Sequence, residues 1–271
     1  MKHATRRAAV LVMALSLFGV AQILKAGPAA ADTLSKVKDS KYILLGFYNE
    51  PPHNWVEPTG GGFHGIDYEI AEAILKKIGV ETINQIPVDW PGLIPGLQAG
   101  RWDMLAVGMS ITPERAKQVL FTKPIYQYGS ALIVAAGNPK GLKGLAQFSG
   151  HRIGAILGST DADLIRSVSG AEFVAYKTHP DMLSDIRAGR IDGALADETT
   201  AGYANVVHPD AAVEILHDWQ GKAARPTGFS FRLEDQAMDD VFNTELAAMK
   251  KDGTIAKILE KYGLTAGNIV Q

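Results

Sequence analysis

The sequence contains no cysteine and no excess of basic residues. Without cysteine the chain cannot form disulfides, thiolate nucleophiles, cysteine-ligated zinc sites or iron–sulfur clusters. Its 27 Lys and Arg residues are outnumbered by 29 Asp and Glu residues, which gives a formal net charge of −2. Because nucleic-acid backbones and anionic membranes are bound by concentrated positive surfaces, this balance argues against both as partners. With 46% hydrophobic residues, the composition is that of a globular protein.

Residues 1–31 have the pattern of an export signal. Basic residues near the start precede an apolar run at 8–24, and small residues at 29–31 offer a cleavage site. This segment holds four basic and no acidic residues, so the 240 residues after it carry 23 basic and 29 acidic residues, a net charge of −6. We expect a cleaved signal peptide and a periplasmic protein. An uncleaved N-terminal anchor is the alternative, and Sec and twin-arginine export both fit.

One helix-to-strand motif occurs twice. Residues 97–106 read LQAGRWDMLA and residues 186–195 read IRAGRIDGAL, each with a helix end, a glycine stop and an apolar run. Strands expected at 42–47 and 152–157 are each followed by a segment with helical periodicity. Both halves therefore alternate strand and helix, which predicts mostly parallel sheets flanked by helices.

Two segments are expected to cross between these halves. The apolar stretch 130–136 leads into a Gly-Asn-Pro turn, and Arg225-Pro226 precedes a second strand-like run. Two crossings imply one lobe made from both ends of the chain and a second lobe inserted between them. We assign residues 32–130 and 228–271 to the first lobe and 131–227 to the second.

The segment from Gly108 to Arg115 carries the first candidate site. Thr112 and Pro113 are typical of an N-cap and a first helical position, so a helix should begin here. Arg115 would then lie in the first turn, where its charge opposes the helix dipole by some tenths of a kcal/mol to about one. A residue that opposes the helix dipole, with no neighbouring residue that offsets the cost, indicates a functional site. We expect Arg115 to bind a carboxylate bidentately beside Ser110; an ordinary surface arginine is the alternative.

Hydroxyls and a carboxylate form the second candidate site. Ser159 and Thr160 lie between a strand and a helix, where they make either an anion cradle or an ordinary N-cap. Asp197 and Glu198 end an apolar strand, and strand alternation allows only one of them to face a cleft. Carboxyl ends of strands are where α/β sheets bind ligands. A cationic and an acidic site facing each other would complement a zwitterion such as an α-amino acid.

Several motifs run in order through nearly all of the chain after residue 31. They are SITPER at 110–115, GST at 158–160, DE at 197–198, FTKPIY at 121–126, GIDYEIA at 65–71 and DGT to KYG at 252–263. Together they resemble the bacterial solute-binding proteins for polar amino acids, the family-3 periplasmic receptors of ABC importers. The resemblance implies the α/β, two-lobed type II periplasmic-binding-protein fold. Each lobe would be a mostly parallel sheet flanked by helices, with a two-crossover hinge between the lobes.

The same resemblance implies roles for the candidate residues. Arg115 and Ser110, with Gly108 beside them, would bind the α-carboxylate. Thr160 would help from the second lobe, and Asp197 would take the α-ammonium; Ser159 is a further candidate ligand-binding residue. It further implies a monomer that delivers its ligand to a membrane permease and needs no cofactor.

Glu50 and Trp90 fall at positions that shape the side-chain pocket in such proteins. An aromatic residue like Trp90 often packs on the ligand there, although simple core packing is the alternative. Glu50 stands where many amino-acid receptors carry an aromatic residue. A carboxylate in a closed cleft is costly unless it meets a cation, so the ligand should carry a second positive or delocalised cationic group. The NEPP segment around Glu50 and the LIPGLQAGR string at 93–101 also resemble the ectoine-binding branch, so a cyclic zwitterion is the alternative to a polar or basic amino acid.

An enzyme on the same fold is the alternative function. Periplasmic cyclohexadienyl-type dehydratases would use Arg115 as substrate anchor and Glu50 or Glu198 as general acid. No pairing of a base with a nucleophile is visible in the sequence, so we expect a binding protein. The seven histidines show no metal-ligand spacing, so we expect no metal.

Overall fold

The computed structural model describes residues 33–57, 60–216, 218–221 and 223–271. The expected signal peptide, residues 1–31, lies outside this part of the chain. Within it, no helix has both the length and the apolar character needed to cross a membrane.

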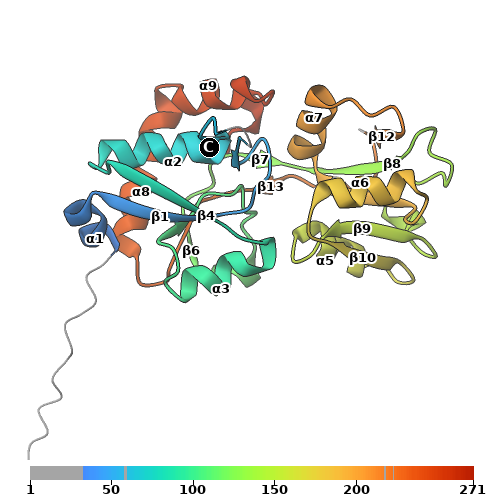
Figure 1. Ribbon diagram of the computed structural model, residues 1–271, viewed down its shortest axis with the longest axis horizontal. Helices are drawn as coiled ribbons and strands as arrows, with labels where there is room; N and C mark the ends of the chain where they lie inside the picture. Colours follow the sequence, from blue (N-terminus) through green and yellow to red (C-terminus); the bar gives the residue numbers. More distant parts are fainter. Residues whose placement is uncertain (1–32, 58–59, 217, 222) are drawn as a thin grey trace, which may run out of the picture. The chain divides into compact units, whose positions relative to one another are not determined.

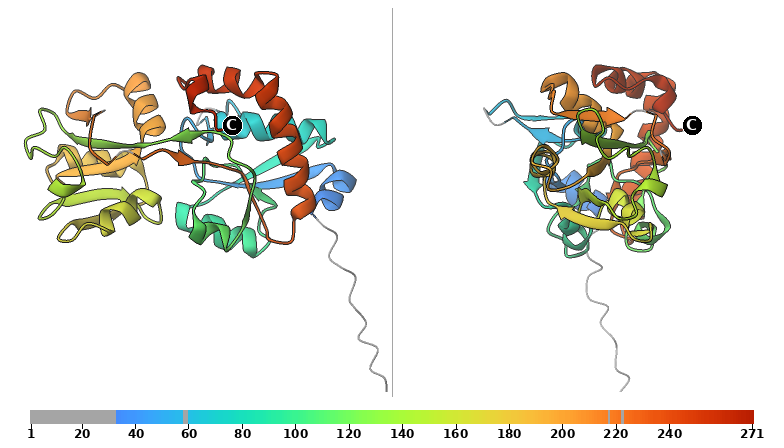
Figure 2. Two further views of the ribbon diagram at one scale, coloured as in Figure 1. Left: turned by 180° about the vertical axis from the view of Figure 1, so that it is seen from behind. Right: turned by 90° about the vertical axis from the view of Figure 1, so that its right-hand side faces the viewer.

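The first sheet is assembled from both ends of the chain. Its strand order is β4 (Thr82–Pro87), β1 (Tyr42–Phe47), β5 (Met104–Leu105), β14 (Ser230–Phe231) and β6 (Leu120–Phe121). β1 pairs in parallel with β4 and β5, and β14 enters antiparallel from the C-terminal part. The helices of this part are α1 (Thr33–Ser40), α2 (Ile66–Lys77), α3 (Leu93–Gln98), α4 (Pro113–Ala116), α8 (Gln236–Lys251) and α9 (Thr254–Lys261), with the 3₁₀ turns η1 (Trp90–Gly92) and η3 (Ala266–Asn268). We call this sheet with its helices lobe 1; Figure 2 shows α8 and α9 along its outer side.

The second sheet is formed entirely by the middle of the chain. Its order is β10 (Glu172–Tyr176), β9 (Arg152–Ile156), β11 (Gly193–Asp197), β8 (Ser130–Ala135) and β12 (Val213–Leu216). β9, β10 and β11 are parallel, whereas β8 runs antiparallel to β11 and β12. It carries α5 (Thr160–Arg166), α6 (His179–Arg187), α7 (Glu198–Val207) and η2 (Leu145–Gln147), and we call this unit lobe 2 (Figure 1).

Two short strands join the lobes. β7 (Gln127–Tyr128) and β13 (Arg225–Pro226) pair antiparallel, and Figure 1 shows both lying between the two sheets. The chain enters lobe 2 through β7 and leaves it through β13. The turn at 137–139, which the sequence indicated as a crossing, instead follows β8 inside lobe 2.

The repeated sequence motif has the same structural role in both lobes. In each copy a glycine after the helix, Gly100 or Gly189, has a positive φ of 67° or 66°. The aspartate three residues later then accepts a backbone N–H from a neighbouring strand: Asp103 from Leu44 at 3.0 Å, and Asp192 from Arg152 at 3.0 Å. The carboxylate thus ties the segment leading into β5 to β1, and the segment leading into β11 to β9, which gives the Asp of each copy the same structural role.

Trp102 fixes α3 against β1, and we expect that packing to be sensitive to a single methyl group. A Cβ added at Gly96 would come 2.0 Å from the Trp102 ring, which is buried. Gly96→Ala should therefore cost about 1–3 kcal/mol of stability, a fall in Tm of about 2–10 °C for a domain of this size. Gly202→Ala on α7 is the matched control, because no atom lies within 4 Å of its added Cβ. Equal melting temperatures for the two variants, measured by calorimetry, would contradict this packing.

Candidate functional site

A small polar cavity lies where the two lobes meet. It is lined by Tyr48, Glu50, Trp90, Ser110, Arg115, Tyr128, Ile156, Ser159, Thr160, Asp161, His179, Leu195, Ala196 and Asp197. Every predicted ligand-binding residue except Gly108 is in this set. Gly108 lies behind the cavity wall: its carbonyl accepts a hydrogen bond from the Tyr128 hydroxyl at 2.7 Å, and a Cβ there would come 2.5 Å from the His53 ring.

Arg115 is a cation held by neutral partners. It lies in α4, whose N-cap Thr112 accepts from the Arg115 backbone N–H at 3.2 Å, as the sequence predicted. Its guanidinium donates to the carbonyls of Ser110 at 2.9 Å and Gly158 at 3.1 Å and lies 5.6 Å from the Trp90 ring centroid. Burial lowers the pKa of Arg115. Within the described residues no carboxylate pairs with this guanidinium, so it can still take an anion.

Trp90 belongs to the same wall. Its ring meets Tyr48 edge-on at 5.7 Å, and its Nε1 donates to the Gly158 carbonyl at 3.1 Å. The Gly158 carbonyl of lobe 2 therefore accepts from both Trp90 and Arg115 of lobe 1. Trp90 is half-buried at the cavity and not simply part of a core.

The hydroxyls of Ser159 and Thr160 have different hydrogen-bond partners. The Ser159 hydroxyl is the N-cap of α5 and accepts from the Ala162 N–H at 3.1 Å, which is the ordinary alternative considered above. The Thr160 hydroxyl accepts from Arg225 Nη1 at 2.5 Å. Both residues line the cavity, but neither hydroxyl is free.

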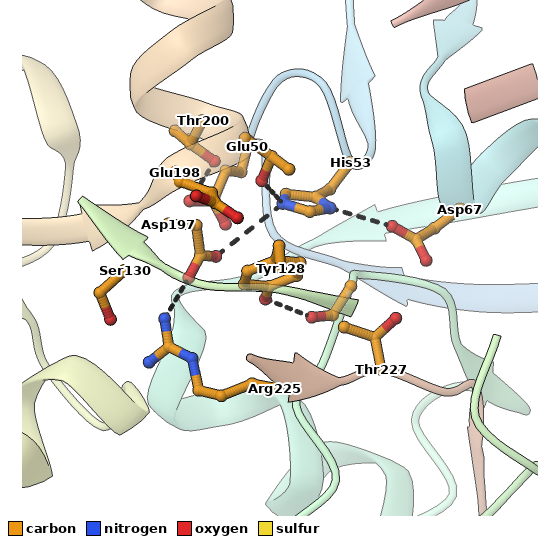
Figure 3. A network of polar contacts seen from close by, with 12 residues as sticks. Glu50, His53, Asp67, Tyr128, Ser130, Asp197, Glu198, Thr200, Arg225 and Thr227 are labelled. Atoms are coloured by element: carbon orange, nitrogen blue, oxygen red, sulfur yellow. Dashed lines mark hydrogen bonds and ion pairs between the residues drawn. The ribbon is translucent and has the colours of Figure 1, made fainter. Parts of the chain in front are cut away.

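Arg225 holds two carboxylates of lobe 2. Its Nη1 donates to Asp161 Oδ1 at 2.8 Å. Its Nη2 donates to Asp197 Oδ1 at 3.1 Å (Figure 3). Burial raises the pKa of Asp197, and Arg225 counteracts this. The sequence analysis missed Arg225 as a site residue, because only the β7–β13 pairing brings this crossover residue to α5 and β11. Asp161 and Asp197 therefore share the single positive charge of Arg225.

Glu50 is a buried acid that pairs with no Lys or Arg in the part of the chain that the structure describes. The Thr200 hydroxyl donates to its Oε1 at 3.2 Å, and His179 Nε2 lies 3.5 Å from the same oxygen. Burial, together with the charge of Asp197, raises the pKa of Glu50 to about 8. Burial lowers the pKa of His179 to about 4. At neutral pH this contact therefore joins two uncharged groups.

His53 connects the acidic side of the cavity to the core of lobe 1. Its Nδ1 lies 2.7 Å from the Tyr126 hydroxyl and 3.4 Å from Asp67 Oδ2, while its Nε2 lies 2.9 Å from the Thr199 hydroxyl and 3.8 Å from Asp197 Oδ2. Burial alone would lower its pKa, but the carboxylates of Asp67, Glu50 and Asp197 together outweigh burial and raise the pKa of His53. Figure 3 shows Asp197 between His53 and Arg225.

Comparison with known proteins gives the family. Residues 43–265 match the bacterial extracellular solute-binding proteins, family 3. The chain belongs to this family. A probable amino-acid ABC transporter periplasmic-binding protein of Sinorhizobium fredii is 32% identical over 95% of this chain and 87% of its own length.

Solved structures of similar proteins share the fold. EhuB in complex with hydroxyectoine has a TM-score of 0.82 and 30% identity, covering 87% of this chain and 94% of its own. An ancestral arginine-binding protein bound to arginine has a TM-score of 0.75 and 32% identity, and the match covers 82% of this chain and 98% of its own. An ancestral amino acid-binding protein, a precursor of cyclohexadienyl dehydratase, has a TM-score of 0.76 and 28% identity, and the match covers 86% of this chain and 99% of its own. The predicted two-lobed type II periplasmic-binding-protein fold is thereby confirmed.

Direct contacts between the lobes enclose the family-3 cavity. The Tyr48 hydroxyl donates to the Lys177 carbonyl at 2.7 Å, and Lys177 Nζ pairs with Asp89 at 2.8 Å. The cavity volume is about 20 Å³, room for little more than a water molecule. Entry of an amino-acid-sized molecule therefore requires the lobes to part.

Proposed function

We propose that the mature protein is the substrate-binding protein of an ABC importer and captures a small zwitterion between its lobes. One observation carries this proposal: among the described residues, no carboxylate pairs with Arg115 and no Lys or Arg pairs with Glu50, although both side chains line the cavity. Arg115 would take the ligand carboxylate, and Glu50 would take a cationic group. Asp197, whose Oδ1 shares Arg225 with Asp161, would take an amino group.

The ligand class we propose is a basic amino acid, with an ectoine-like cyclic zwitterion as the second candidate. A basic amino acid has one carboxylate and two cationic groups, which matches Arg115, Asp197 and Glu50 together. An ectoine-like guest has a carboxylate and one delocalised cation, which would use Arg115 and Glu50. Support comes from the arginine and hydroxyectoine complexes of similar structures.

The proposed cycle is capture without chemistry. Lobe 1, residues 32–130 and 228–271, would bind the carboxylate first through Arg115. Lobe 2, residues 131–227, would then close, adding Thr160 and Asp197, and the closed protein would dock on a membrane permease. We place the protein in the periplasm as a monomer, after removal of residues 1–31.

A thermal-shift screen of residues 32–271 tests this function. The panel would contain the twenty amino acids, ornithine, ectoine and hydroxyectoine, since a ligand that binds only the folded state raises Tm by mass action. A concentration-dependent rise with a cationic zwitterion, confirmed by calorimetric titration, is the expected result. No rise with any member would contradict the proposal.

A dehydratase remains a second candidate because Glu50 is held protonated at neutral pH, as a general acid must be. Incubation with a cyclohexadienyl acid would decide between the two, with aromatic product detected by its ultraviolet absorbance. We expect no product, and product formation that depends on Glu50 would replace the receptor proposal.

A further inference from the structure

A second and much larger cavity borders the first. We call it the outer chamber; it has a volume of about 1030 Å³ and shares Tyr48, Glu50 and His179 with the inner cavity. That volume is at the upper end of the range for small-molecule sites, whereas the inner cavity measures about 20 Å³. Glu50 therefore lies on the border between the two cavities.

The wall of the outer chamber is apolar and aromatic. Its lining includes Tyr48 and Trp55 of lobe 1 and Leu183, Tyr203 and Val207 of lobe 2. The Trp55 and Tyr203 rings lie 5.7 Å apart. Val207 is 46% exposed although it is apolar, as is Val56 at 38% in the same lining. Such a surface is suited to an apolar or aromatic group.

Charged groups in this wall are largely paired with one another. Lys177 pairs with Asp89 at 2.8 Å, and Arg187 pairs with Asp210. The Glu57 carboxylate accepts from Trp55 Nε1 at 3.1 Å. The outer chamber therefore offers little to a charged group, in contrast to Glu50 at its inner end.

We propose that the outer chamber is a second subsite for the ligand, and that the natural guest is a basic zwitterion whose distal nitrogen carries an apolar or aromatic substituent. The carboxylate would bind Arg115, the substituted nitrogen would pair with Glu50, and the substituent would pack against the apolar lining that includes Tyr203 and Val207. This inference rests on the proposed function and narrows its ligand class.

Three probes with one head group test the subsite. L-lysine, Nε-methyl-L-lysine and Nε-benzyl-L-lysine keep the same charges but add a growing substituent. We expect the benzyl compound to bind about tenfold or more tightly than lysine by calorimetric titration, the gain from burying a phenylalanine-sized group. A benzyl compound that binds no more tightly than lysine would overturn the inference.

Two neighbouring valines provide a matched pair of variants. Val207→Asp places a charge in the outer chamber and should remove the gain from the benzyl group. Val206→Asp, on the same helix but 79% exposed and outside the lining, should keep it. Tyr203→Ala is a second chamber variant in case Val207→Asp does not fold, and it should also reduce the gain. A gain that persists in both chamber variants would overturn the inference.

The results of the two experiments distinguish failure of the subsite inference from failure of the proposed receptor function. If none of the three lysine probes binds while the thermal-shift screen finds another zwitterion, the subsite inference is overturned and the receptor function stands. If the screen finds no ligand at all and the lysine probes also fail, both are overturned.

Discussion

Arg115→Met is expected to lower the affinity for the zwitterionic ligand by about 100- to 1000-fold while leaving the fold intact. The guanidinium is proposed to make a bidentate bond to the ligand carboxylate, and hydrogen bonds to charged groups contribute about 1.5–3 kcal/mol each. In the structure its partners are two carbonyls and the Trp90 ring, so its removal leaves no buried carboxylate unpaired. Calorimetric titration with the ligand from the screen measures the loss.

Arg101→Met is the control for this prediction. Arg101 is an exposed arginine of the same lobe, so its replacement should change neither affinity nor Tm. Arg115→Lys adds a further distinction, because it keeps the charge but loses the planar pair of donors and should recover only part of the affinity. Unchanged affinity in Arg115→Met would show that the carboxylate binds elsewhere.

Glu50→Gln is expected to lower the affinity for a doubly cationic guest by at least 30-fold at pH 8.5, with a smaller loss at pH 6. In the empty protein the pKa of Glu50 is raised from 4.5 to about 8, so the carboxyl is protonated at neutral pH. A cation bound beside it would lower that pKa, so binding would release a proton. Affinity of the native protein should therefore increase as pH rises toward 8 and level off above it, by at most about tenfold per pH unit. In Glu50→Gln this increase should be absent.

The stability of the empty protein should show the opposite pH dependence. Because the folded-state pKa of Glu50 is raised, its contribution to the free energy of unfolding is present below pH 4.5 and is lost as pH rises through about 8. His179 faces Glu50 from α6, but its pKa of about 4 means that it stays neutral across this range. His53 and Asp197 also lie nearby and titrate in both proteins, so the comparison is with Glu50→Gln. Parallel stability curves for the two, measured by denaturant titration from pH 5 to 9, would show that Glu50 is ionised in the empty protein.

Features set by local rules could be predicted from the sequence. The strand at Tyr42–Phe47 and the helix start after Thr112 are confirmed, because burial periodicity and capping act within a few residues. The repeated motif with its Gly and Asp could also be recognised in the sequence. Only the structure shows that Asp103 and Asp192 bind neighbouring strands. The order of motifs along the chain was enough to indicate the family.

The cavity's charge arrangement depended on contacts between distant parts of the chain. Arg225 reaches Asp161 and Asp197, 64 and 28 residues away, only because β13 pairs with β7 between the lobes. Glu50 was identified from its place in a motif, but its protonation depends on burial against Thr200, 150 residues away.

The sequence by itself determined the family, the alternation of strand and helix, and most of the residues that line the cavity. Tertiary structure alone decided which of those residues are already paired, which charges remain for a ligand, and that an apolar chamber adjoins them. The physical reason is that secondary structure and capping follow from neighbours along the chain, whereas desolvation and charge pairing depend on every group packed around a site.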